Sequence, residues 1–203
     1  MPNHTYYKRN LPHQLVPGSS LFLTMRLADS LPKAVLQQLQ LETANAELAA
    51  LRTGYAGEQS YARQKRYFGR FDRLLDGAQS GPTWLSQANV AAVITGSIHA
   101  FLDDGGCQLV CYCVMSNHLH LVVELGEEET GLMRKLQRFK SYTAIQANRV
   151  LNRNGQFWHR ESYDHVIRNA PEMERVVAYV LNNPVKAGMV NRWQDWPYTF
   201  WKM

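Results

Sequence analysis

The chain has 203 residues, of which 45% are hydrophobic, and it carries a net charge of +5. This length and composition are typical of one globular domain with elaborations, or of two small domains. The sequence contains no apolar run of about 18 residues, which excludes a membrane-spanning helix. Because no apolar secretory segment follows the first methionine, we expect a cytoplasmic protein with no membrane partner.

The first half of the chain predicts one strand and three helices. Residues 1–20 are polar and interrupted by prolines, which is typical of an arm or loop. Residues 21–27 are apolar and partly alternating, so we expect a strand there. Apolar residues at helical spacing then predict helices over residues 32–52, about 58–76 and 84–102.

The second half predicts a hairpin followed by two helices. Residues 107–115 and 118–125 are apolar segments on either side of a Ser-Asn turn, which indicates two antiparallel strands. A helix of about 20 residues is expected to end near residue 154, and another over residues 171–182 stops before a proline. Residues 157–168 show no clear periodicity and receive no assignment.

This order of elements predicts an α+β fold in a single domain spanning residues 1–203. A small antiparallel sheet with helices on one face accommodates the order strand, helices, strand, strand, helix. The ferredoxin-like (RRM-like) topology is the best-known member of that class. Three additions to this core are expected: an N-terminal arm (about 1–20), a helical insertion (about 33–80) and a C-terminal extension (about 171–203).

Three cysteines lie within the first strand of the predicted hairpin, at positions 107, 111 and 113. An odd number of cysteines in one short apolar segment argues against a disulfide framework and fits a reducing compartment. Their spacing is not that of a structural zinc site. We therefore expect small, buried strand residues.

Two histidines flank one apolar residue at the start of the second hairpin strand. If residues 118–125 form a strand, His118 and His120 point to the same face and lie roughly 6–7 Å apart along it. Two imidazoles at that separation can share a divalent metal ion. A chain with seven histidines can also contain such a pair by chance, so the neighbouring residues must support the interpretation.

The unassigned segment 157–168 is rich in functional side chains. It offers a third metal ligand, for which the candidates are His165, Asp164 and Glu161. Its single tyrosine, Tyr163, could attack a metal-bound phosphate and form a covalent phosphotyrosine. The alternative is that the ring of this tyrosine only packs. Tyr142 is a competing nucleophile within the preceding helix.

A long stretch of the chain is basic without any acidic residue. Between residues 130 and 160 there are seven cations and no carboxylate, which favours a phosphate-binding surface over a salt-bridged solvent face. A solvated basic helix is the alternative. The DNA-binding candidates are four residues of this helix, two arginines near the tyrosine and one tryptophan that could stack on bases: Arg134, Lys135, Arg138, Lys140, Arg160, Arg168 and Trp158.

The same motifs, in this order, resemble the REP-associated tyrosine transposases of the HUH single-tyrosine nuclease superfamily. The segments that carry the resemblance are residues 26–32, 114–122, 157–165 and 182–188. It implies a ferredoxin-like core, a Mg²⁺ or Mn²⁺ ion on the two histidines, and a tyrosine that leaves a 5′-phosphotyrosine and a free 3′-OH. It also implies single-stranded DNA with imperfect hairpins as substrate, and a protein that acts as a monomer or homodimer.

Within this resemblance, Tyr163 is the predicted nucleophile and His165 the predicted third ligand. The insertion-sequence relatives place a polar metal ligand one helical turn after the tyrosine, where this chain has Ile167. Residues 182–184 are interpreted as a helix stop that orients the C-terminal tail.

Two other functions remain open at this level. One is a non-catalytic nucleic-acid binding module, although the aromatic run typical of RRM domains is missing. The other is a metal-dependent phosphodiesterase that uses activated water. The nuclease hypothesis predicts that Tyr163→Phe loses both cleavage and the covalent adduct, whereas the hydrolase hypothesis predicts that cleavage is kept.

Overall fold

The computed structural model describes residues 5–8, 12–15, 17–52, 58–77, 81–128 and 131–202. The chain divides into two compact units, of which the first contains residues 1–28 and 83–203 and the second residues 29–82. No helix among the described residues has the length and apolar character needed to cross a membrane.

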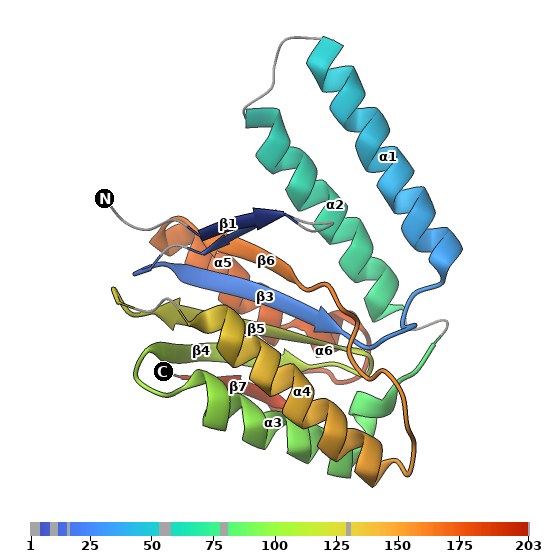
Figure 1. The fold of residues 1–203 in the computed structure, drawn as a ribbon, viewed down its shortest axis with the longest axis vertical. Coiled ribbons are helices and arrows are strands. Elements are labelled where there is room, and N and C mark those ends of the chain that lie inside the picture. Colours follow the sequence, from blue (N-terminus) through green and yellow to red (C-terminus); the bar gives the residue numbers. More distant parts are fainter. Residues whose placement is uncertain are drawn as a thin grey trace. The chain divides into compact units, whose positions relative to one another are not determined.

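A five-stranded antiparallel sheet organises the first unit (Figure 1). The strand order is β6-β3-β5-β4-β7. The bounds are Ser20–Arg26 for β3, Cys107–Val114 for β4, His118–Leu125 for β5, Tyr163–Ile167 for β6 and Thr199–Trp201 for β7. With helices α3 (Ala88–Leu102) and α4 (Leu132–Val150), the order β3-α3-β4-β5-α4-β6 is ferredoxin-like. The predicted fold class is confirmed.

Helices α3 and α4 pack on one face of this sheet and form the main core with it (Figure 1). Alternate residues of the central strands point into this core, as Leu119, Leu121 and Val123 of β5 do. Helix α5 (Ala170–Leu181) lies on the other face, where Tyr179 packs against Phe22 of β3. Both faces of β5 are therefore covered, which explains why its polar residues near the turn are as buried as its apolar ones.

The C-terminal extension begins with a strongly capped helix. The Asn169 side chain accepts a hydrogen bond from the Glu172 N–H at 3.0 Å, and Pro171 occupies the first turn. After α5, the short helix α6 (Asn183–Lys186) begins with Pro184 in its first turn. The predicted stop before this proline is present. β7 then pairs with the outer edge of β4.

Among the described residues of segment 1–20, the structure has two strands where an arm or loop was expected. Strands β1 (Thr5–Lys8) and β2 (Pro12–Leu15) pair antiparallel in a two-stranded sheet. Pro12 is the first residue of its strand, a position where the missing N–H of proline is tolerated. The prolines of this segment indicate only breaks in regular structure, whereas the cross-strand pairing depends on residues from both strands. The start of the predicted helix 84–102 is also different, since Trp84–Ser86 forms a separate 3-10 turn, η1, before α3.

The second unit is a pair of helices inserted between β3 and α3. Helices α1 (Lys33–Arg52) and α2 (Glu58–Asp76) pack against each other, and Arg70 of α2 forms an ion pair with Glu42 of α1. The ends of the insertion meet at Gly81, where a Cβ atom would lie 2.2 Å from the Asp29 carbonyl oxygen. Gly81 also has a φ of +84°, so only glycine fits this close approach without strain.

Candidate active site

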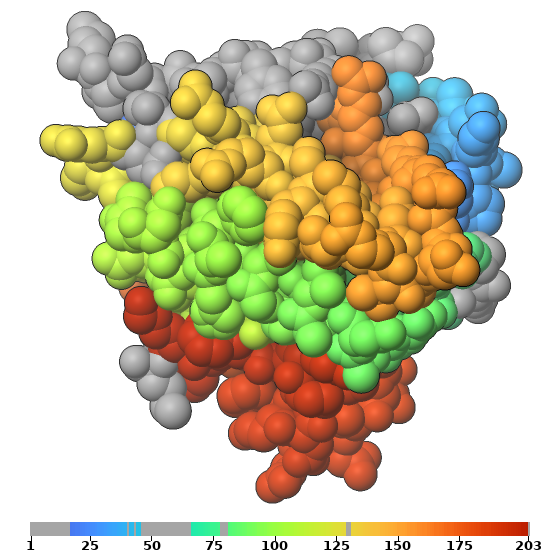
Figure 2. All heavy atoms as spheres, turned by 60° about the horizontal axis from the view of Figure 1, so that its bottom comes forward, coloured from blue at the N-terminus to red at the C-terminus, as the bar shows by residue number. Residues whose placement is uncertain are grey.

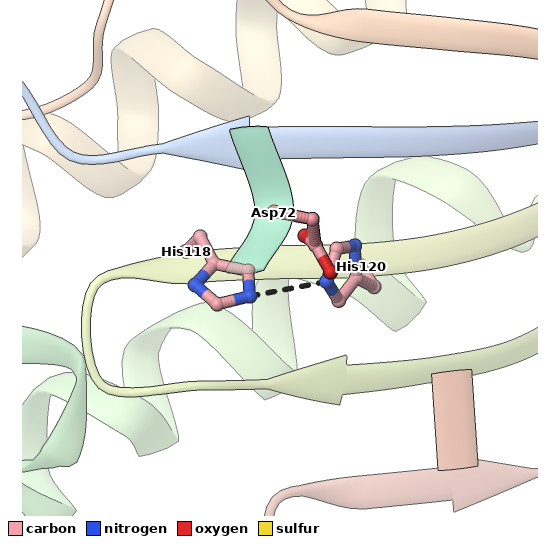
Figure 3. A group of neighbouring side chains, drawn as sticks. All are labelled: Asp72, His118 and His120. Carbon is pink, nitrogen blue, oxygen red and sulfur yellow. Dashed lines mark hydrogen bonds between the residues drawn. The ribbon is translucent and has the colours of Figure 1, made fainter. Parts of the chain in front are cut away.

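Two buried imidazoles face each other at the start of β5. His118 and His120 are both 0% exposed, and their Nε2 atoms are 3.0 Å apart (Figure 3). Each ring is held through its other nitrogen, since His118 Nδ1 bonds Asn117 Oδ1 and His120 Nδ1 bonds Thr24 Oγ1, both at 2.7 Å. Figure 3 also draws Asp72, a buried residue of α2 that belongs to the second unit.

This arrangement fits a divalent metal ion. The side-chain Oδ1 of Asn117 can only accept, so His118 Nδ1–H donates this hydrogen bond, which leaves the lone pair of Nε2 for a ligand. In an octahedral site with bonds of about 2.1 Å, neighbouring ligand atoms are about 3.0 Å apart, which is the separation found here. His118 and His120 therefore form a candidate metal site. Among the described residues of the first unit, no other histidine, cysteine or carboxylate has a ligand atom that lies within 4.8 Å of the ligand atoms of both histidines.

The register places several other polar side chains on the same face of the sheet. Arg26 of β3 is paired with His118, and it is only 4% exposed. Thr24 is paired with His120 on one side and with Tyr163 of β6 on the other. Directly paired residues of antiparallel strands point to the same side. The histidine face therefore has a buried cation opposite His118 and a tyrosine at its edge.

Tyr163, the predicted nucleophile, lies two strands away from the histidines. Two strand spacings put its Cα about 10 Å from that of His120. Its ring is 7% exposed and makes an edge contact with Phe22 at 6.2 Å between ring centroids. Phe22 itself stacks on His120 at 5.5 Å. The structure thus places an aromatic ring in contact with both Tyr163 and His120, and the role of Tyr163 stays a prediction.

His165, the predicted third ligand, is engaged elsewhere. Its Nε2 lies 3.1 Å from Glu172 Oε1, and the other oxygen of Glu172 accepts the Arg168 N–H at 3.0 Å. These bonds join the end of β6 to the first turn of α5. Asp164, a further candidate, is paired with the core residue Leu23 and so lies on the opposite face of the sheet from the histidines. The structure does not bring either residue to the pair.

A second tyrosine, absent from the sequence-based site, contacts the histidine pair. Tyr179 of α5 has its ring centroid 5.7 Å from that of His120. The Lys186 Nζ lies 4.5 Å from the centre of the same tyrosine ring. Four residues after Tyr179 comes Asn183, which is fully buried and whose side-chain O and N have no hydrogen-bond partner among the described residues. A buried orphan amide needs a polar partner, and an amide oxygen is a suitable metal ligand.

A signal for this pair was present in the sequence. The expectation of a polar ligand one helical turn after the tyrosine fails at Tyr163, where the residue is Ile167. Applied to Tyr179, the same spacing finds Asn183. Asn183 is the first residue of α6 and follows Tyr179 of α5 by four residues, which is about one helical turn of chain.

Two of the predicted phosphate-binding lysines are bound to the protein itself. Lys140 Nζ donates to the carbonyls of His159 and Arg160, at 2.7 and 3.2 Å, and to Ser162 Oγ at 3.2 Å. It therefore ties α4 to the segment that leads into β6. Lys135 Nζ lies 2.8 Å from Asp104 Oδ1, and this hydrogen bond lowers the pKa of the aspartate.

The arginines and the tryptophan of the predicted DNA-binding set differ in exposure. Arg134, Arg138, Arg160 and Arg168 are exposed. Trp158 is only 4% exposed, and its Nε1 donates to Thr143 Oγ1 at 2.8 Å. The structure corrects the expectation that Trp158 stacks on bases, because its ring is part of the core between α4 and the sheet.

His159 belongs to the predicted site segment 157–168 and lies near two cations. Burial lowers the pKa of its imidazole, and the charges of Arg26 and Lys140 lower it further. Its Nδ1 accepts a hydrogen bond from the Glu161 N–H at 3.2 Å. His159 is therefore neutral in the folded protein at neutral pH, with the protonated form disfavoured.

The comparison with protein families decides the class of this domain. The family model described as "Transposase IS200 like" matches residues 83–183, which include the histidine pair, Tyr179 and Asn183. Residues 83–183 belong to the IS200-like transposase family. Among related family proteins, the chain is 28% identical over 101 residues to a putative REP-associated tyrosine transposase of Haemophilus influenzae, covering 45% of this chain and 57% of that protein.

Two further relatives agree with this family. A REP-associated tyrosine transposase of Escherichia coli is 26% identical over 92 residues, which are 45% of this chain and 53% of that protein. The chain spans a little more than half the length of these two curated relatives. The structure of a REP-associated tyrosine transposase bound to a REP hairpin has the same fold, with a TM-score of 0.51 at 16% identity over 96% of this chain and 81% of that one.

Proposed function

We propose that this chain is a metal-dependent nuclease and strand transferase that cuts single-stranded DNA beside hairpins through a covalent phosphotyrosine. The observation that carries the proposal is the facing His118–His120 pair with the ring of Tyr179 beside it. Two relatives of the domain are named tyrosine transposases, and the solved relative is bound to a REP hairpin. These names support single-stranded hairpin DNA as the substrate class.

The metal site in this proposal consists of His118, His120 and Asn183. Two imidazole nitrogens and an amide oxygen are a mixed donor set, in which imidazole favours transition metals and the oxygen suits Mn²⁺ and Mg²⁺. We expect Mn²⁺ to bind more tightly than Mg²⁺. When bound, such an ion would polarise the scissile phosphate and offset the negative charge that develops on it.

The nucleophile in this proposal is Tyr179 rather than Tyr163. The ring of Tyr179 touches His120 directly, whereas Phe22 stands between His120 and Tyr163. The Tyr179 oxygen attacks phosphorus and forms the new O–P bond while the bond from phosphorus to the 3′ oxygen breaks. The phenol proton passes to solvent, the 3′ oxygen takes up a proton from solvent and leaves as a hydroxyl, and the 5′ end stays on the tyrosine. Because the bond energy is conserved, the same site can rejoin the strand.

Two cations are placed to stabilise the charges of this step. Lys186 lies 4.5 Å from the centre of the Tyr179 ring and brings a positive charge beside it. Arg26 is buried on the histidine face opposite His118. A guanidinium at that position can donate paired hydrogen bonds to a phosphate. Both are proposed contacts of the scissile phosphate.

The test is an assay for a covalent adduct. Protein is incubated with end-labelled hairpin DNA that has single-stranded flanks, with Mn²⁺ or Mg²⁺, and the products are separated on a denaturing gel. The variants are Tyr179→Phe, Tyr163→Phe, Tyr142→Phe and His118→Ala. We expect a slow-migrating, metal-dependent adduct that is lost in Tyr179→Phe and His118→Ala and kept in the other two.

Each other outcome would identify either a different nucleophile or a different function. Loss of the adduct in Tyr163→Phe alone would identify Tyr163, the residue predicted from sequence, as the nucleophile. Cleavage without any adduct would identify a phosphodiesterase that uses activated water. Binding of hairpins without cleavage, together with no Mn²⁺ binding by calorimetry, would identify a non-catalytic nucleic-acid binding module.

A further inference from the structure

A continuous exposed stripe runs along α4 on the side away from the core. Its members recur at intervals of three and four residues, fall within an arc of about 80° and extend over about 22 Å. They are Arg134, Arg138, Tyr142, Ile145 and Arg149, and all are exposed. The buried residues of the helix, from Leu132 to Ala147, lie on the opposite side. Figure 2 shows α4 beside α3 on this face of the molecule.

The centre of the stripe is an aromatic platform. The Tyr142 side chain is 46% exposed, and its ring centroid lies 5.5 Å from that of Phe101 at the end of α3. Arg138 also contacts Phe101, with its guanidinium carbon 5.7 Å from the centre of that ring. Phe101 is half-buried and supports both neighbours. The Tyr142 ring is thus held in place while one side of it stays accessible.

The charge of the stripe indicates the kind of ligand. Three of its five residues are arginines, and no acidic residue occurs between positions 131 and 160. A cationic track with an exposed aromatic ring is the arrangement by which proteins hold single-stranded nucleic acid, with arginines on the phosphates and the ring under a base. An acidic peptide would satisfy the arginines but would not need the accessible ring.

We propose that Tyr142, supported by Phe101, stacks on an unpaired base of the DNA substrate, and that Arg138 and its neighbours on the stripe hold the adjoining phosphates. The inference rests on the proposed function, because it takes single-stranded DNA as the ligand. It adds a second binding site, on the face of the sheet opposite the histidines. It also gives Tyr142 a role that needs its ring and not its hydroxyl group.

The test compares affinities for two labelled hairpins by fluorescence anisotropy without added divalent metal, so that no strand is cut. One hairpin carries a short single-stranded tail and the other is blunt. We expect Tyr142→Ala to weaken binding of the tailed hairpin by about 5- to 150-fold, with a much smaller effect on the blunt one. Tyr142→Phe should bind like the wild type. Gln137→Ala, an exposed position on α4 outside the stripe, is the matched control.

The outcomes separate this inference from the proposed function. If wild type binds the tailed hairpin and Tyr142→Ala binds it equally well, only the stacking site is refuted. The same holds if Tyr142→Phe loses as much affinity as Tyr142→Ala, since the hydroxyl would then be the important group. If wild type binds neither hairpin, the proposed function fails and the stacking site fails with it. Circular dichroism of each variant verifies that the fold is kept.

Discussion

Removing one hydroxyl group beside the histidine pair tests the candidate metal site with little change in shape. The bond between Thr24 Oγ1 and His120 Nδ1 is 2.7 Å long, and the two residues are 3% and 0% exposed. In Thr24→Val the ring nitrogen loses this partner while the side-chain volume is almost unchanged. Loss of a partner that orients a metal-bound histidine typically costs about 10- to 100-fold in metal affinity. The unpaired buried nitrogen should also lower the free energy of unfolding by about 1–3 kcal/mol.

The assay is calorimetric titration with Mn²⁺, combined with urea unfolding of the metal-free protein. Thr143→Val is the matched control, because Thr143 is also fully buried and accepts a hydrogen bond from the Trp158 ring at 2.8 Å. We expect a similar loss of stability in both variants and a loss of Mn²⁺ affinity only in Thr24→Val. If Thr24→Val keeps the Mn²⁺ affinity of the wild type, the reasoning is refuted. If both variants lose the same Mn²⁺ affinity, the loss comes from general destabilisation and not from the bond to His120.

Four further predictions concern single side chains. Lys140→Met removes an ammonium that donates to three acceptors and should lower the free energy of unfolding by about 1–3 kcal/mol. Lys135→Met, which removes a partly exposed ion pair, should cost less than about 1 kcal/mol in the same urea titration. Burial lowers the pKa of His159 in the folded protein. As the pH falls below about 6.5, the imidazole of His159 is therefore protonated in the unfolded chain before it is protonated in the folded one. Stability should therefore decrease with acid, and His159→Gln should reduce the slope; an unchanged slope of thermal midpoint against pH would contradict this. Burial raises the pKa of the Cys111 thiol to about 12, so a thiol reagent should modify it only after denaturant is added, and rapid labelling of the native protein would show that the strand opens.

Local sequence patterns were sufficient for the three central strands of the sheet, β3, β4 and β5, and for the histidine pair. Residues 107–125 predict a hairpin because their apolar residues form two short runs separated by a turn signal, and this depends only on neighbours in the chain. The two-residue period of a strand then puts His118 and His120 on one face. The ferredoxin-like core follows from the order of the elements, for which few topologies are available. These features are local, and the structure has them.

The tertiary structure decided which other side chains reach that pair. Tyr163 and Tyr179 both lie in the C-terminal part of the chain. A polar residue one turn later distinguishes Tyr179 in the sequence, but no local pattern gives the distance of either ring from His120. The choice depends on α5 packing on the face opposite α3 and α4, which no local pattern records. In the same way, the sequence indicates Lys140 and Trp158 as DNA-binding residues. In the folded protein, Lys140 instead donates to backbone carbonyl oxygens, and Trp158 packs among core side chains. The sequence by itself determined the three central strands and the two imidazoles, because strand period and turn chemistry act between neighbours. The partners of those imidazoles come from segments distant in the chain, and only the packing of the helices brings them together.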